Sequence, residues 1–165
     1  MYQFKRGFKM SYERAKAHLE KYGLADRIKL FEVSSATVSL AAEALGTEEK
    51  KIAKTLTFAV GDGAIAVVCA GDTKIDNHKF KEAFGCKAKM LSFESVERLV
   101  GHGVGGVCPF GINEGVKVFL DASLKRFDKI FPAAGTANSA VELTLEELEQ
   151  ASEPIGWVDV TLIKV

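Results

Sequence analysis

The chain has 165 residues, with 22 Lys and Arg against 22 Asp and Glu, so its formal net charge is zero. Its length fits one domain, and a composition of 47% hydrophobic and 27% charged residues is typical of a soluble globular protein, which excludes global disorder. A chain without net positive charge is not expected to bind a long stretch of duplex DNA, because each phosphate that it neutralises needs a Lys or Arg. Any nucleic-acid contact is therefore expected to be small and local.

The first half of the chain is predicted to form two helices, a short strand and a β-hairpin. Apolar residues at helical spacing, with a capping residue before them and a glycine after them, predict each helix. Two apolar runs joined by Gly61-Asp62-Gly63 predict the hairpin, because these glycines suit a tight reversal. The expected elements are a helix from Ser11 to Tyr22, a strand over 28–33, a helix from Ser34 or Ser35 to Leu45, a helical turn over 47–52, and hairpin strands over 54–60 and 64–70.

The second half is predicted to contain three more helices and several short strands. The run Thr144-Leu145-Glu146-Glu147 fits a capping box, in which the threonine and Glu147 satisfy each other's backbone N–H groups. The expected elements are a helix from Asp76 or Asn77 to Phe84, a strand over 87–91, a helix from Ser92 to Val100, strands over 116–121, 129–133 and 140–143, a helix from Thr144 to about Gln150, and a closing strand over 157–165.

These elements do not alternate regularly as strand, helix and strand, so the predicted fold class is α+β. Hairpin connections favour a mixed, largely antiparallel sheet with flanking helices. No linker or repeat divides the chain. We expect one domain over residues 10–165, preceded by an N-terminal extension over residues 1–9, because Met10 could also serve as the start.

Several classes of site and location find no support in the sequence. No apolar run reaches the length of about 18 residues that a membrane span needs. The cysteines Cys69, Cys86 and Cys108 form no C-x-x-C pair, and the three histidines have no metal-ligand spacing, so neither a disulfide framework nor a metal site is expected. Reduced thiols of this kind fit a cytoplasmic protein.

A glycine-rich loop, Gly-His-Gly-Val-Gly-Gly-Val-Cys-Pro-Phe-Gly over 101–111, follows the predicted helix that ends at Val100. It contains G-x-G-x-x-G, but a dinucleotide fingerprint needs a strand before it and a helix after it. Here a helix precedes and Cys108-Pro109 follows, so we reject that interpretation. Glycine lets a ligand approach the backbone, and the loop amides could form an oxyanion hole. A structural turn would explain the glycines equally well.

Lys54 is a charged residue at the start of an apolar strand. By period-two alternation it shares a side of that strand with Leu56 and Phe58. Its ammonium group could then face a cavity and bind a phosphate or polarise a carbonyl. An ordinary strand-end lysine that reaches solvent along its stem remains the alternative.

Four segments together resemble the YbaK/prolyl-tRNA-synthetase-associated editing family. Ile52-Ala53-Lys54-Thr55-Leu56 is similar to the signature around the family's essential lysine, and Gly105-Gly106-Val107-Cys108-Pro109 is similar to its G-x-x-x-P loop. The segments 70–76 and 118–124 resemble family segments in matching order. The resemblance covers about residues 30 to 150, and the ordered set is far more specific than G-x-x-x-P alone.

The resemblance implies a curved mixed sheet and a trans-editing aminoacyl-tRNA deacylase. Such enzymes hydrolyse the ester that joins a wrong amino acid to the terminal adenosine of tRNA, with no metal or organic cofactor. The expected partner is the acceptor end of a mischarged tRNA, such as proline tRNA carrying Ala, Cys, Ser or Thr, with an aminoacyl-tRNA synthetase as a further candidate partner. No membrane or DNA partner is expected.

The resemblance also implies which residues form the site. Lys54 is the expected catalytic side chain, and the backbone of Gly105, Gly106, Val107, Cys108 and Pro109 is expected to shape the substrate pocket. An aminoacyl ester is already activated, so catalysis needs a positioned nucleophile and a stabilised oxyanion rather than a metal. The attacking water is expected to be assisted by a ribose hydroxyl of the tRNA.

Other polar residues are weaker candidates. Thr136, Asn138 and Ser139 could line the pocket as hydrogen-bond donors, or could form a turn rich in local bonds. Asp121 could lie near the pocket or cap a turn. Some family members carry a histidine where this chain has Phe131, so the preferred amino acid stays open.

Two other functions are compatible with the sequence. The chain could be a non-catalytic module of the same fold that binds an amino acid or a tRNA end. It could instead be a thiol hydrolase in which Cys108 is the nucleophile and His102 its base. Cys108 and His102 are close in sequence, but this does not place them within hydrogen-bond distance of each other. Cysteine is also often simply buried.

Overall fold

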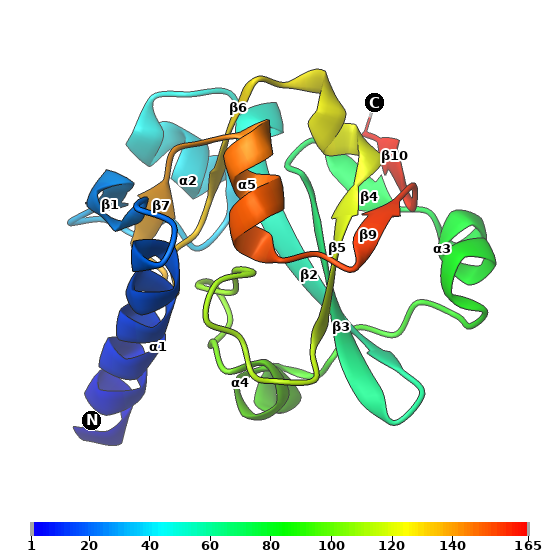
Figure 1. Cartoon of the computed structure of the whole chain (residues 1–165), viewed down its shortest axis with the longest axis horizontal. Coiled ribbons are helices and arrows are strands. Elements are labelled where there is room, and N and C mark those ends of the chain that lie inside the picture. The colour runs from blue at the N-terminus through cyan, green and yellow to red at the C-terminus, as the bar shows by residue number, and fades with distance from the viewer. Residues whose placement is uncertain (1, 165) are drawn as a thin grey trace.

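The computed structural model describes residues 2–164, with side chains from Ser11 onward. A six-stranded sheet runs through the middle of the molecule (Figure 1). Its strands, in spatial order, are β8 (Leu143–Thr144), β6 (Lys129–Pro132), β2 (Ile52–Val60), β3 (Gly63–Ala70), β5 (Lys117–Asp121) and β9 (Gly156–Val158).

The sheet is mixed, as predicted. The β2–β3 hairpin is antiparallel and pairs Ala53 with Ala70 through Val60 with Gly63. β6 lies parallel to β2, β5 parallel to β3 and β9 parallel to β5, while β8 is antiparallel to β6. Two further antiparallel pairs lie outside this sheet: β1 (Ile28–Leu30) with β7 (Ser139–Val141), and β4 (Thr73–Ile75) with β10 (Thr161–Ile163).

Alternate residues of the hairpin face two different apolar cores. Ala66 and Val68 join a large cluster with side chains of α1 (Tyr2–Glu20) and α5 (Leu145–Ser152), which cover one face. Phe58 and Val67 pack on the other face with side chains of α3 (Asn77–Phe84). β3 is therefore buried on both sides, which explains its nearly continuous run of apolar residues.

Two more helices lie near β2, and both contribute residues to the cavity described below. α2 (Val38–Leu45) packs Ala41 and Ala42 against Ile52 of β2 and Phe131 of β6. α4 (Phe93–Val100) precedes the glycine-rich loop that leads to β5. Short 3-10 turns cover Ala25–Arg27, Glu49–Lys51 and Ala122–Arg126.

Most predicted helix boundaries are confirmed, because they depend on local capping. Asp76 and Ser92 cap α3 and α4 by accepting from backbone N–H groups, and Thr144 forms the predicted capping box with Glu147. Gly46, Gly85 and Gly101 end their helices in the left-handed conformation that glycine tolerates.

Several details of the predicted elements are wrong. The first helix begins at Tyr2, so Ser11 lies inside it and caps nothing. Thr37, rather than Ser34 or Ser35, caps α2. The predicted strand over 87–91 is reduced to a single bridge between Met90 and Phe58, and the closing strand is divided into β9 and β10. Residues 2–9 continue α1, and the division into an extension over 1–9 and a domain over 10–165 stays a prediction.

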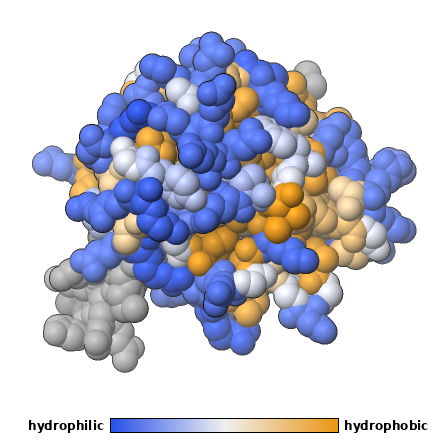
Figure 2. Space-filling view, viewed as in Figure 1, coloured by the Kyte–Doolittle hydropathy of each residue, from blue (hydrophilic) through white to orange (hydrophobic). Residues whose placement is uncertain are grey.

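Most of the surface that Figure 2 shows is hydrophilic, and apolar side chains gather in the lower half of this face, below α5. Across the described part of the chain, none of the helices combines the length and the apolar character that crossing a bilayer would require.

Candidate functional site

A cavity of about 440 Å³ lies between α2, α4, the glycine-rich loop and one edge of β2. Its floor comes from β2, from Ile52 to Thr57. The segment that leads into α2 and the segment after β6 supply the opposite walls. The other lining residues are Ser35, Ala36, Thr37, Val38, Ala41, Met90, Leu91, Phe93, Val96, Val104, Gly105, Val107, Phe131, Ala133, Ser139 and Ala140.

Lys54, Gly105 and Val107 line this cavity together. Lys54 lies more than 50 positions before the two loop residues in sequence, and the structure brings them to one space. Gly106, Cys108 and Pro109 complete the loop but do not line the cavity, and all three are buried.

Lys54 is only partly buried, and among the described side chains none forms an ion pair with it. Its Nζ donates a hydrogen bond to the backbone carbonyl of Thr73. Removal from water lowers the pKa of the Lys54 ammonium below its usual value; the charge of Lys164 adds to this and that of Asp72 opposes it. Lys54 is therefore a cation with poor solvation, which increases its attraction for an anionic or polarised ligand group.

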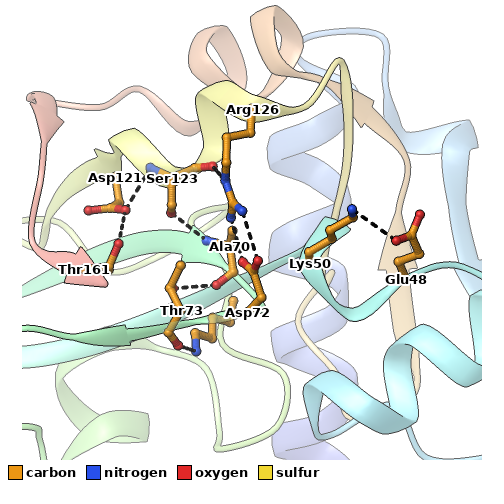
Figure 3. Close-up of polar contacts among 10 residues, drawn as sticks. Glu48, Lys50, Ala70, Asp72, Thr73, Asp121, Ser123, Arg126 and Thr161 are labelled. Carbon is orange, nitrogen blue, oxygen red and sulfur yellow. Dashed lines mark hydrogen bonds and ion pairs between the residues drawn. The ribbon is translucent and has the colours of Figure 1, made fainter. Parts of the chain in front are cut away.

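The turn that receives Lys54 is itself fixed by polar contacts (Figure 3). The Arg126 guanidinium donates two hydrogen bonds, of 2.6 and 2.9 Å, to the Asp72 carboxylate. This pairing lowers the pKa of the Asp72 carboxyl. Thr73 Oγ1 donates to the Ala70 carbonyl at 2.6 Å. At the same turn, a Cβ on Gly71 would lie 2.1 Å from the Glu49 carbonyl oxygen, so only glycine fits there. The sequence indicated this segment only through its resemblance to the family. The contact that fixes it joins Arg126 to Asp72, which are 54 positions apart, so sequence spacing could not reveal it.

The glycines of the loop allow close packing at the cavity wall. Gly105 has a φ of +94°, and a Cβ there would lie 3.2 Å from Ala36 Cβ and 3.3 Å from Ala137 Cβ. A Cβ on Gly106 would lie 2.6 Å from the backbone nitrogen of Thr136. The Gly106 N–H is already bonded to the Gly103 carbonyl at 3.1 Å, so it is not a free donor for an oxyanion.

Cys108 and His102 lie behind the loop, in the core. Cys108 has no exposed surface, and burial raises the pKa of its thiol to about 12. Burial lowers the pKa of His102 to about 4. His102 Nε2 lies 2.6 Å from the Phe110 carbonyl and 3.6 Å from Cys108 Sγ, and Nδ1 lies 2.5 Å from Ser11 Oγ. Neither Cys108 nor His102 lines the cavity.

Asp121 is also a structural residue in this arrangement. It is buried, and its carboxylate accepts from Ser123 N, Val160 N and Thr161 Oγ1 at 2.7–3.0 Å. Figure 3 shows Asp121 facing Thr161 of β10. The carboxylate therefore ties the C-terminal strand to the end of β5, away from the cavity.

Ser139 lines the cavity, whereas Thr136 and Asn138 do not. Asn138 Nδ2 donates to the Phe31 carbonyl at 3.0 Å, and Thr136 Oγ1 donates to Asn138 Oδ1 at 2.8 Å. Ser139 Oγ accepts from Ala134 N and donates to the Thr136 carbonyl. Asn138 therefore joins the segment before α2 to the segment after β6, while Thr136 and Ser139 fix the turn that carries it.

Sequence reasoning missed several lining residues. Phe93, Met90 and Val104 stand at the cavity with exposed fractions of 76%, 58% and 53%. Thr55 lines the cavity, and its buried hydroxyl has no hydrogen-bond partner in the described part of the chain. An apolar residue at a helix start, and a threonine in a β-branched strand, carry no distinct signal in sequence. Among the described lining residues none is Asp, Glu or His.

Comparison with known proteins identifies a family over the part of the chain that forms the cavity. Residues 32–151 match the family model described as an aminoacyl-tRNA editing domain, and this range contains all the lining residues. The chain belongs to the aminoacyl-tRNA editing domain family. It is 47% identical over 152 residues to the uncharacterized protein YwhH of Bacillus subtilis, which covers 92% of this chain and 97% of that protein.

Other editing-domain relatives include synthetases and solved structures. The chain is 30% identical over 110 residues to a proline–tRNA ligase of Bacillus cytotoxicus, matching 66% of this chain but only 18% of the ligase. A crystal structure named "putative trans-editing enzyme for prolyl tRNA synthetase" superposes with a TM-score of 0.83 at 27% identity, over 92% of this chain and 97% of that chain. The likeness extends across the whole fold, which confirms the predicted fold class.

Proposed function

We propose that this protein is a trans-editing aminoacyl-tRNA deacylase. Its substrate would be a tRNA, proline tRNA or a related one, that carries a small wrong amino acid such as Ala, Cys, Ser or Thr. Its partners would be the acceptor end of that tRNA and an aminoacyl-tRNA synthetase that presents it. One observation carries the proposal: Lys54 and the glycine-rich loop line a single cavity of about 440 Å³.

The lining suits the chemistry of ester hydrolysis without a side-chain base. A water oxygen attacks the ester carbonyl carbon, the bond from that carbon to the ribose oxygen breaks, and the ribose oxygen takes up a proton. No described lining residue is Asp, Glu or His, so the neighbouring ribose hydroxyl of the tRNA is left to orient the water. Lys54 supplies a poorly solvated positive charge that would bind the terminal nucleotide or stabilise the oxyanion.

A non-catalytic module is the second candidate, and the same lack of acids and bases in the wall favours it. Such a module would bind the amino acid or the tRNA end in this cavity and release it unchanged. The two candidates differ in turnover.

A deacylation panel tests the proposal. Proline tRNA charged with Ala, Cys, Ser or Thr would be incubated with wild type, Lys54→Ala and Lys129→Ala, and the remaining ester measured over time. Lys54→Ala should lose about 100-fold or more in rate, in the range for loss of one group that stabilises an oxyanion. Lys129 is an exposed lysine on β6 outside the cavity, so its variant should act as wild type does.

The outcomes separate the candidates. Full deacylation by a folded Lys54→Ala variant, with its fold checked by circular dichroism, would contradict the role of Lys54. Binding of the mischarged tRNAs by wild type with no turnover on any of them would favour the binding module.

A further inference from the structure

An unpaired stretch of strand edge lies in the cavity wall. β2 pairs with β3 along one side from Ala53 to Val60. On its other side it pairs with β6 only at Ile52 and Ala53. From Thr57 onward that side is bonded to the segment before α4, with Leu91 N to Thr57 O at 3.1 Å and Ala59 N to Lys89 O at 2.8 Å. Within residues 2–164, no strand pairs with residues 54–56 on this side.

Thr55 presents its backbone to this gap. Backbone N–H and C=O groups of successive strand residues point to alternate sides. The Thr57 carbonyl and the Ala59 N–H point away from β3, toward residues 89–91. Thr55 lies two positions before Thr57, so its own N–H and C=O point the same way. The cavity wall therefore offers a backbone donor and a backbone acceptor outside the hydrogen-bond ladders of the sheet.

The side chain of Thr55 adds a third polar group. Its Oγ1 is buried and has no hydrogen-bond partner among the described residues, and Thr55 lines the cavity. A buried hydroxyl without a partner costs about 1–3 kcal/mol. Such groups are rare in native proteins and call for an explanation. A ligand in the cavity that bonds to Thr55 would supply one.

The three groups at Thr55 fit the common part of an aminoacyl ester, which has an amino donor and a carbonyl acceptor on adjacent carbons. The described wall contains no carboxylate, so an amino group can find only neutral acceptors there. We propose that the amino acid part of the substrate docks on Thr55 as one more strand residue would. Its α-amino group donates to the Thr55 carbonyl and Oγ1, and its ester carbonyl accepts from the Thr55 N–H. This inference rests on the proposed function.

This mode of binding divides recognition into two parts. Thr55 holds atoms that all amino acids share, as in the addition of a peptide to a sheet edge. The amino acid side chain is then directed to the apolar walls, where Val38, Ile52 and Val107 lie. Selection among amino acids would come from the shape of those walls, while Thr55 requires a free amino group.

Two unreactive ligands test this inference by isothermal titration calorimetry. One is 3′-alanylamino-3′-deoxyadenosine, in which an amide replaces the ester; the other is its 3′-propionylamino counterpart, which lacks the amino group. Wild type should prefer the alanyl ligand about tenfold, as expected for a hydrogen bond to a charged group. Thr55→Val should reduce that preference at least about threefold with unchanged affinity for the propionyl ligand, and Thr55→Ser should retain it.

Ser152→Ala is the matched control. Ser152 carries the other buried hydroxyl without a partner among the described residues, but it lies in α5, outside the cavity. Thr55→Val and Ser152→Ala should both unfold at or above the temperature of wild type, and only the former should change ligand preference.

Equal binding of both ligands by wild type, or an unchanged preference in Thr55→Val, would overturn the inference. The proposed function can fail while the inference about Thr55 holds. If wild type prefers the alanyl ligand through Thr55 but hydrolyses no mischarged tRNA, Thr55 still binds the amino group and the protein is a binding module.

Discussion

At the scale of single residues, position relative to the cavity separates the groups that a ligand there can contact from those that it cannot. Lys54 and Thr55 line the cavity, whereas Cys108 and His102 contact each other behind it. A thiol whose pKa is raised to about 12 carries almost no thiolate near neutral pH, and thiolate is the nucleophilic form. The order of residues along the loop gave no indication of this, because adjacent loop residues can face opposite directions.

Alkylation of the native protein tests the burial of Cys108. Cys86 is partly exposed, whereas Cys69 and Cys108 are buried. Treatment with iodoacetamide near neutral pH should label Cys86 alone, as read by mass spectrometry, and should leave deacylation intact. Cys108→Ala should also keep its activity, at a small cost in stability. Loss of activity that follows labelling of Cys108 would instead support a thiol mechanism.

At the scale of elements, local signals were predictable from sequence and long-range ones were not. Asp76, Ser92 and Thr144 cap helices by bonding to N–H groups a few positions away, so sequence spacing was sufficient to find them. Ser11 resembles a cap but bonds to His102, 91 positions away, inside a longer helix. Ser35 N bonds to the Ala137 carbonyl at 2.6 Å, which keeps that segment extended and moves the α2 cap to Thr37.

The contact of α1 with the glycine-rich loop gives a prediction at this scale. Gly111 has a φ of +65°, and a Cβ there would lie 2.5 Å from the Arg14 carbonyl oxygen of α1. Gly111→Ala should therefore lower the free energy of unfolding by about 3 kcal/mol, the sum of left-handed strain and a steric clash. Gly115→Ala is the control, because Gly115 has a φ of +91° with nothing within 4 Å, and it should lose only about 1 kcal/mol.

Urea unfolding measures both variants. Equal losses for Gly111→Ala and Gly115→Ala would show that α1 does not pack closely on the loop. Gly103→Ala, at a position with open space around it and no left-handed φ, should be close to neutral.

At the scale of the whole molecule, the fold class and the mixed sheet were predictable from the hairpin, the irregular order of elements and the family resemblance. The cavity was not predictable, because its walls come from four segments that are far apart in sequence. These segments are held together by long-range hydrogen bonds, such as those of Asn138 and Ser35. Sequence likeness identified Lys54 and the loop. It could not show that, within residues 2–164, no strand pairs with β2 between Ala53 and Thr57 on the side away from β3.

Global stability should depend on pH through His102. In the unfolded chain this histidine binds a proton near pH 6.5, whereas burial in the native state delays protonation to about pH 4. Between these values the unfolded state binds more protons, so stability is complete above pH 6.5 and falls as the pH drops toward 4. Wild type should lose about 2 kcal/mol of unfolding free energy between pH 7 and pH 5.

Urea unfolding of His102→Gln over the same range should show a much smaller loss, whatever its stability at pH 7. His78→Gln, at an exposed histidine on α3, is the control and should follow wild type. An identical pH dependence in all three proteins would mean that His102 binds its proton equally well in the folded and unfolded states.

The gap beside β2 has a consequence for self-association. An unpaired strand edge on a protein surface is a template for a strand from another chain, and natural proteins protect such edges from aggregation. Here the free edge is three residues long, with β6 bonded to the strand before it and residues 89–91 bonded to the strand after it. A neighbouring polypeptide could not extend a ladder beyond these three positions, whereas a single amino acid needs only one of them. The protein can thus keep backbone groups available without becoming prone to form fibres.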